Sequence, residues 1–200
     1  MTSVPDLPVL AERVVRAALS KDPERCCHSV AVARTAAAVA DSLPSRDGQV
    51  LIAAAYLHDV GQASSLKVTG HHGLDGALHL DGRFPDRVVT LVAHHSESRW
   101  EADLRGLAQE LAAFTREESI VADALTYCDM TTGPTGQRVS LAERLADVSQ
   151  RYGPDHVVSR SVEFALPYLT AAVTRVQREL LDSTPPHGPQ RSTAASPPAR

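Results

Sequence analysis

The sequence predicts an all-α protein. Apolar residues recur at spacings of three and four along most of the chain, as they do on one face of an α-helix. No segment shows the alternation of apolar and polar residues that is typical of a half-buried β-strand, and no internal repeat is present. The chain has 200 residues, of which 43% are hydrophobic. One helical domain with a substantial core is therefore the expected architecture.

Eight helices follow from this spacing and from the local start and stop signals. Pro23 suits the first position of a helix. Ser140 and Glu143 have the spacing of a capping box. Pro167 lies inside the last helix and is expected to kink or split it. The expected helices cover residues 7–20, 23–43, 48–60, 72–80, 85–97, 117–130, 140–152 and 156–181.

Composition divides the chain into a domain and a tail. Residues 1–182 form the expected domain, with its chemical motifs between residues 24 and 150. Residues 183–200 contain five of the thirteen prolines and very few apolar residues. Such a segment cannot bury enough surface to offset its ordering entropy, so we expect it to be disordered. Residues 130–140 read as a loop that leaves Asp129 at the mouth of a site.

Charge and hydropathy exclude several classes of partner. A net charge of -4 gives no basic surface for nucleic acid or for an anionic membrane. No apolar run reaches the roughly 20 residues that span a bilayer, and the N-terminus lacks the features of a signal peptide. Three cysteines, two of them adjacent, favour reduced thiols. We expect a cytoplasmic protein that binds neither nucleic acid nor membrane; the sequence predicts no oligomeric state.

Histidines are concentrated in one part of the chain. Seven of the nine lie between residues 28 and 95, and histidine is the commonest metal ligand. His58 and Asp59 end the apolar stretch "AAAYLHDVGQ", where a bare buried carboxylate would be costly. His28 keeps step with the apolar face of its helix, and Asp129 ends another apolar stretch. Taken singly, each has an ordinary alternative, a hydrogen-bonded core histidine or a helix-end residue.

The order of these residues along the chain resembles the HD-domain superfamily of metal-dependent phosphohydrolases. In that family an all-helical bundle holds metal through a first His, a His-Asp doublet and a final Asp. The resemblance covers roughly residues 24–150, and "HDVG" is its sharpest element. It implies a core set of ligands, namely His28, His58, Asp59 and Asp129.

Two further segments resemble those that supply a second ion in many members of this family. "HHGLDGA" would provide His72, and "LVAHHS" would provide one histidine of its pair. Helical periodicity favours His95 as the inward member, whereas the resemblance favours His94, and we predict His94. Asp59 would then be shared between two ions. Imidazole and carboxylate ligands suit iron, manganese, zinc, nickel or cobalt and do not select among them.

The resemblance implies hydrolysis of a small phosphorylated substrate, such as a nucleotide or another metabolite, by metal-activated water. Asp59 would be essential as the shared ligand. His95 would act as an acid or contact the substrate, and Gln62 would position water. Arg99 and Lys67 are the candidate cations for the phosphate, although both could equally be solvated surface residues.

Two other classes of function stay open at this point. A few relatives with the same ligand set are di-iron oxygenases, which would be recognised by two irons and by the absence of phosphatase activity. A sensor domain that binds nucleotide without turnover is the third reading. A sensor domain would be expected if ligand residues were missing from the sequence, and here no residue of the core set is missing.

Overall fold

The computed structural model describes residues 6–182, and the regular secondary structure of this part of the chain consists of helices alone. Its only strand-like pairing is an isolated bridge between Thr132 and Arg138. The prediction of an all-α protein is confirmed, whereas the expected disorder of residues 183–200 lies outside the described residues. The α-helices are α1 (Leu7–Ala18), α2 (Pro23–Ala40), α3 (Ser45–Leu57), α4 (His72–Leu80), α5 (Asp86–His94), α6 (Arg99–Arg105), α7 (Ala108–Leu111), α8 (Ile120–Met130), α9 (Leu141–Tyr152) and α10 (Val157–Asp182); the short 3-10 helices are η1 (Val60–Gln62) and η2 (His95–Glu97).

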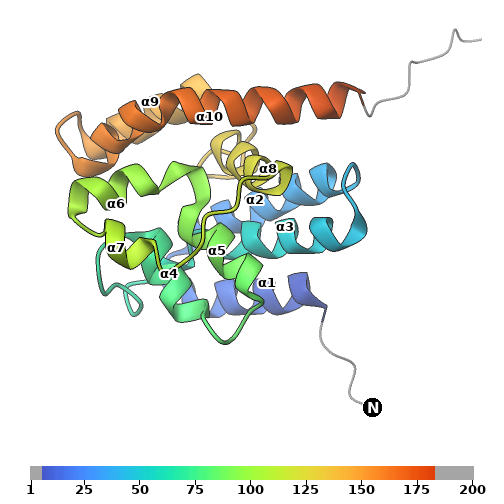
Figure 1. Cartoon of the computed structure of the whole chain (residues 1–200), viewed down its shortest axis with the longest axis horizontal. Coiled ribbons are helices and arrows are strands. Elements are labelled where there is room, and N and C mark those ends of the chain that lie inside the picture. Colours follow the sequence, from blue (N-terminus) through green and yellow to red (C-terminus); the bar gives the residue numbers. More distant parts are fainter. Residues whose placement is uncertain (1–5, 183–200) are drawn as a thin grey trace, which may run out of the picture.

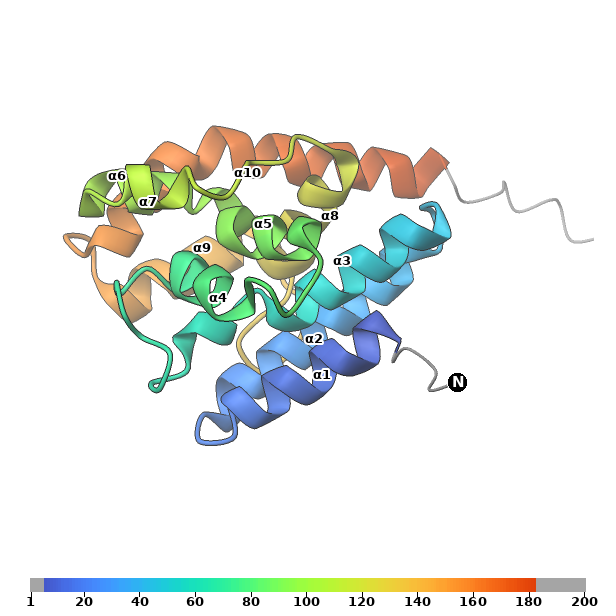
Figure 2. The same ribbon diagram turned by 60° about the horizontal axis from the view of Figure 1, so that its bottom comes forward.

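Helix α3 is the centre of the bundle. It packs against α1, α2, α5 and α8 (Figure 1). Helices α1 and α2 lie on one side of it and α5 and α8 on the other (Figure 2). The longest helix, α10, crosses the opposite side of the molecule, where it contacts α6, α8 and α9 (Figure 2). Helices α2 and α8 and the C-terminal ends of α3 and α5 therefore meet in the interior, between α1 and α10.

Small side chains bring α2 close to α3. Ala33 and Ala36 on α2 and Ala53 and Ala54 on α3 are fully or almost fully buried. Alanine lets two helix backbones approach closely, because it places only a methyl group between them. As a result, the ring of His28 on α2 and that of His58, directly after α3, lie with their centroids 5.3 Å apart.

The helix starts are set as the sequence predicts. Pro23 occupies the first position of α2, and Asp22 caps that helix by accepting a hydrogen bond from the backbone N–H of Arg25 at 3.1 Å. Ser140 and Glu143 form the predicted capping box of α9. Helix α4 has the predicted bounds of residues 72–80.

Three local predictions are corrected. The helix expected over residues 85–97 ends at His94, and the short helices α6 and α7 follow in a segment that has no expected helix. The third helix ends at Leu57 rather than at residue 60. At Pro167, where a kink or a split is expected, α10 is continuous, so the helix is not split there. Pro167 lies on the exposed side of α10, where water can hydrogen-bond the carbonyl group that the proline leaves unpaired.

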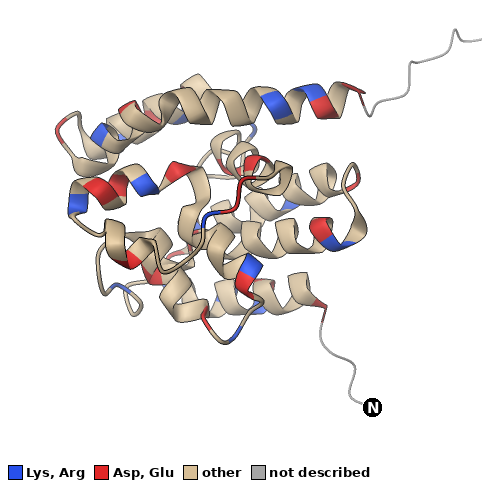
Figure 3. Ribbon diagram, in the orientation of Figure 1, with Lys and Arg blue, Asp and Glu red and all other residues tan. Residues whose placement is uncertain are grey.

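The surface carries both signs of charge. Figure 3 shows acidic and basic residues interspersed along the ribbon. Among residues 6–182, no helix combines the length and hydropathy that a bilayer-spanning segment requires.

Candidate metal centre

The His58–Asp59 doublet lies in the turn that ends α3. The helix ends at Leu57, and the backbone of Asp59 (φ -100°, ψ 9°) leaves the helical path to begin η1. A regular helix would separate neighbouring side chains by about 100°. Here both side chains are buried, and His58 Nε2 lies 3.8 Å from Asp59 Oδ2. The turn therefore directs both residues into one site.

Backbone carbonyl groups fix the orientation of three buried imidazoles. His58 Nδ1 is 2.8 Å from the carbonyl oxygen of Ala55, and His95 Nδ1 is 2.7 Å from that of Val92. His28 Nδ1 is 3.1 Å from the carbonyl oxygen of Gly133. A carbonyl oxygen only accepts, so Nδ1 carries the proton in each ring. In the neutral form of each ring, the lone pair is then on Nε2, which is the arrangement of metal-binding histidines.

These lone pairs meet two carboxylates in two adjacent groups of three residues. The potential ligand atoms within each group lie within 4.8 Å of one another. The first group is His28, His58 and Asp129, and the second is Asp59, His72 and His95. The two groups adjoin, because the His58 ring lies between those of His28 and His95, with centroid distances of 5.3 and 5.2 Å.

The distances inside the groups are those of ligands around a shared centre. His28 Nε2 lies 3.2 Å from Asp129 Oδ1, and His72 Nε2 lies 3.5 Å from Asp59 Oδ1. His72 Nε2 and His95 Nε2 are 3.1 Å apart. His58 Nε2 is buried and has no hydrogen-bond partner. A buried polar atom without a partner is costly unless something else binds it. This set of residues fits one or two metal ions.

Electrostatics keeps the ligands in the protonation states that a metal requires. Burial lowers the pKa of His58 to about 4 and that of His72 to about 3. Although burial opposes it, the neighbouring His58, His72 and Arg25 hold the pKa of Asp59 below its usual range. His28 and Arg144 act in the same way on the pKa of Asp129. Neutral imidazoles and charged carboxylates at neutral pH are the forms that bind metal.

His28 is the exception among these imidazoles. Burial lowers its pKa, but the hydrogen bond and the charge of Asp129 outweigh burial and raise it above the ordinary value. A cation at the centre would replace that proton as the partner of the carboxylate, so proton and metal compete for His28.

A strained turn after α5 completes the site. Ser96 and Glu97 have φ angles of 49° and 59°, a region that costs a residue with a side chain about 1 kcal/mol or more. The Ser96 hydroxyl donates to Asp129 Oδ2 at 2.6 Å. The chain reversal thus presents His95 and Ser96 to the same buried centre.

Glycine lets α4 approach the doublet. A Cβ atom on Gly61 would lie 2.1 Å from the carbonyl oxygen of His72 and 2.5 Å from the backbone N of Gly76. The φ angle of Gly61 is not positive, so the residue is needed for space rather than for its conformation. This contact places His72 beside Asp59.

The structure corrects the choice between the paired histidines. His94 points away from the centre, and its Nε2 donates to the carbonyl oxygen of Phe114 at 2.6 Å. His95 lies in the second group of ligands. The structure therefore places the member that helical periodicity favours, and not the one carried over from the family resemblance, among the potential ligands.

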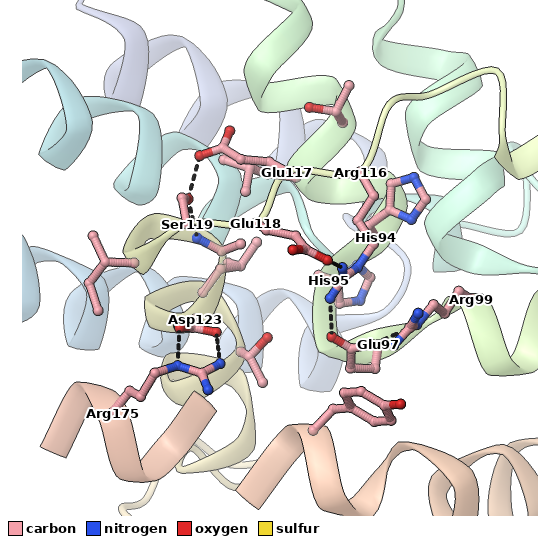
Figure 4. A pocket seen from close by; sticks show the side chains of 17 residues that line it. His94, His95, Glu97, Arg99, Arg116, Glu117, Glu118, Ser119, Asp123 and Arg175 are labelled. Atoms are coloured by element: carbon pink, nitrogen blue, oxygen red, sulfur yellow. Dashed lines mark hydrogen bonds and ion pairs between the residues drawn. The ribbon is translucent and has the colours of Figure 1, made fainter. Parts of the chain in front are cut away.

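The expected phosphate-binding cations also lie elsewhere. Arg99 stacks on the rings of Trp100 and Tyr168. It also pairs with Glu97 at 2.8 Å (Figure 4). Glu97, Arg99 and Tyr168 line a second cavity, whose walls also include His94 and His95. Lys67 is exposed and does not line the cavity over the ligand groups. Gln62 does line that cavity.

Comparison with protein families identifies the chain. The family model for the HD domain matches residues 25–131, more than half of the sequence. The chain belongs to the HD domain family. No curated protein and no solved structure gave a significant match. Members of this superfamily are commonly metal-dependent phosphohydrolases, and some have no catalytic activity.

This HD domain has three arginines at the mouth of its buried centre. Arg25 Nη1 donates to Asp59 Oδ2 at 3.2 Å, and Arg144 Nη2 donates to Asp129 Oδ1 at 3.4 Å. Arg151 lines the same cavity. The Nε of Arg144 is buried without a hydrogen-bond partner. An unused charged donor at this position suits an anionic ligand.

Sequence reasoning missed all three arginines, although one of them had a visible signal. Arg25 lies one helical turn before His28, and this spacing indicates a shared helix face. Arg144 and Arg151 lie on α9, which reaches the centre only through tertiary packing. No local pattern in the sequence connects them with His28 or His58.

Proposed function

We propose that this HD domain is a metal-dependent phosphohydrolase that cleaves a phosphate ester of a small metabolite. One observation carries the proposal: three oriented imidazoles and two charged carboxylates lie together beside Arg25, Arg144 and Arg151. The histidines and carboxylates suit a metal, and the arginines suit a phosphate. The two features share one cavity.

Two groups of three ligands support two ions. His28, His58 and Asp129 would hold one, and Asp59, His72 and His95 would hold the other. Mixed imidazole and carboxylate donors suit iron, manganese, zinc, nickel or cobalt. A bound divalent ion supplies activated water at neutral pH and offsets charge on the phosphoryl oxygens.

The remaining residues bind and orient the substrate. Arg25, Arg144 and Arg151 provide permanently charged donors for the phosphate oxygens, and an arginine can bind two of them at once. Gln62 lines the same cavity beside Asp59 and can orient a water through its amide. In the reaction the water oxygen bonds to phosphorus, and the ester P–O bond breaks. A proton passes from the water to the leaving oxygen, giving an alcohol and phosphate.

Phosphate release from a panel of esters tests this function. Protein loaded in turn with each of the five metals should release phosphate in at least one case. Asp59→Ala should abolish both bound metal and activity, whereas Asp103→Ala, at an exposed position of α6, should preserve both. Iron-dependent consumption of dioxygen without phosphate release would indicate an oxygenase instead. Tight ligand binding without turnover under every metal would indicate a sensor domain.

A further inference from the structure

Two residues with side chains have left-handed backbone angles at the edge of the metal centre. Ser96 (φ 49°, ψ 36°) and Glu97 (φ 59°) are the two residues other than glycine that have positive φ between residues 6 and 182. Glycine adopts such angles without steric cost, because it has no Cβ atom. Neither residue is asparagine or aspartate, which tolerate this region better than other residues with side chains. A strained position that keeps a side chain suggests that the side chain has a function.

The structure around the turn holds it in this conformation. The hydroxyl of Ser98, at the end of the turn, donates to the carbonyl oxygen of Ala93 at 2.6 Å. The carbonyl oxygen of Ser98 in turn accepts a hydrogen bond from Nε2 of the buried His71 at 2.9 Å. Strained backbone angles persist where the surroundings fix them from several sides. The position of the Ser96 side chain is therefore fixed as well.

The two strained residues contact different partners. The carboxylate of Glu97 pairs with Arg99 and with Arg116, at 2.8 Å in each case (Figure 4). The hydroxyl of Ser96 instead donates to Oδ2 of Asp129 at 2.6 Å, a length typical of a hydrogen bond to a charged carboxylate. Ser96 therefore contacts a potential metal ligand, whereas Glu97 belongs to neither group of ligands and contacts cations.

This hydrogen bond separates the roles of the two oxygens of Asp129. Oδ2 accepts from Ser96, whereas Oδ1 lies 3.2 Å from His28 Nε2 and 3.8 Å from His58 Nε2. Arg144 also reaches Oδ1, at 3.4 Å. The last torsion of an aspartate side chain has a broad range, so a carboxylate without a fixed partner can rotate. A donor held at Oδ2 limits this rotation and keeps Oδ1 toward the imidazoles.

From this geometry we infer that Ser96 is a positioning residue of the metal centre. Its hydroxyl holds the Asp129 carboxylate so that Oδ1 faces the ion, and the strained turn places the hydroxyl there. The inference rests on the proposed function, because it assigns Asp129 to one of two metal ions. Ser96 itself is not a ligand, and it acts through Asp129.

Cobalt binding to Ser96→Ala and Ser96→Gly tests the inference without depending on turnover. Both variants lose the hydroxyl. Competition with a chelator should show that each binds one Co²⁺ ion per chain about 10–100-fold more weakly than the unchanged protein, the usual effect of removing a partner that orients a ligand. The visible absorption of bound Co²⁺ depends on its ligands and their geometry, so it should change in both variants.

Thermal unfolding of the metal-free proteins separates the strain from the hydroxyl. Ser96→Gly should have a Tm about 2–4 °C above that of Ser96→Ala, because only alanine keeps the steric cost of a positive φ. Glu97→Gly and Glu97→Ala are the matched controls, since they change the neighbouring strained residue. They should differ in Tm in the same direction, and both should keep the cobalt affinity and the absorption spectrum of the unchanged protein.

Each outcome distinguishes the inference from the proposed function. Unchanged cobalt affinity in both Ser96 variants would overturn the inference, and so would a loss that appears in Ser96→Ala but not in Ser96→Gly, because strain rather than the hydroxyl would then explain it. An equal loss in Glu97→Ala would also overturn it. If the cobalt results are as expected but no ester is hydrolysed with any metal, the positioning role stands and the hydrolase proposal fails. If esters are hydrolysed while the Ser96 variants bind Co²⁺ normally, the hydrolase stands and the inference fails.

Discussion

Exchanging His95 or His94 for alanine tests the metal centre with two adjacent, chemically identical residues. His95 Nε2 lies 3.1 Å from His72 Nε2, inside the second group of ligands. His95→Ala leaves that group with Asp59 and His72 alone. Changing residues that merely orient a ligand costs about 10–100-fold in metal affinity or activity. Loss of the ligand itself should cost at least 100-fold in both.

His94→Ala should have the opposite profile. It removes the hydrogen bond from Nε2 to the carbonyl oxygen of Phe114 and leaves that carbonyl without this partner. The cost is about 1–3 kcal/mol of stability. For a domain of this size, this corresponds to a fall in Tm of roughly 2–12 °C. Metal content should not change, because His94 points away from both groups of ligands.

Elemental analysis, turnover and thermal unfolding of the two variants distinguish loss of metal from loss of stability. We expect His95→Ala to lose one ion per chain and nearly all activity, and His94→Ala to lose only stability. The reasoning would be refuted by the reverse pattern, in which His94→Ala loses metal and His95→Ala keeps two ions.

Three further predictions follow from the same site. Gly61→Ala should lower Tm by many degrees and reduce metal content, because its Cβ would overlap backbone atoms of α4; an unchanged Tm would contradict this. Arg144→Ala should lower kcat/KM for phosphate esters at least tenfold with metal content retained, whereas the exposed Arg34→Ala should not; equal kinetics for the two would remove Arg144 from the substrate site. In chelator, stability should fall as pH drops from about 6.5 toward 4, because burial lowers the folded-state pKa of His58 to about 4 and that of His72 to about 3, so the unfolded state binds more protons. The raised pKa of His28 opposes this loss but involves one imidazole against two; a Tm that does not change between about pH 6.5 and 4 would contradict the prediction.

Much of the fold could be predicted because its signals are local. Helix α4 has its predicted bounds, and the capping box of Ser140 and Glu143 begins α9 as expected. These features depend on residues within one helical turn. The segment containing α6 and α7 was missed because its helices have seven and four residues, too few for a periodic apolar pattern to be visible.

The site itself was predictable where a ligand lies on a regular helix, and uncertain where the backbone leaves one. His28 and Asp129 follow the apolar faces of α2 and α8 and lie in the centre. His95 lies one residue beyond α5, where the following residues take positive φ angles. No sequence pattern signals that turn, because Ser96 and Glu97 are not residues that favour it.

The arginines show why a substrate site is harder to predict than a metal centre. Arg99 was chosen because it is close in sequence to the paired histidines, yet its guanidinium stacks on Trp100 and Tyr168. A metal ligand is recognisable from its residue type, since a buried histidine or aspartate needs a partner. An arginine on a surface helix has an ordinary solvated alternative. Only the packing of α9 across the centre distinguishes Arg144 from Arg34, which is equally charged and closer in sequence to His28.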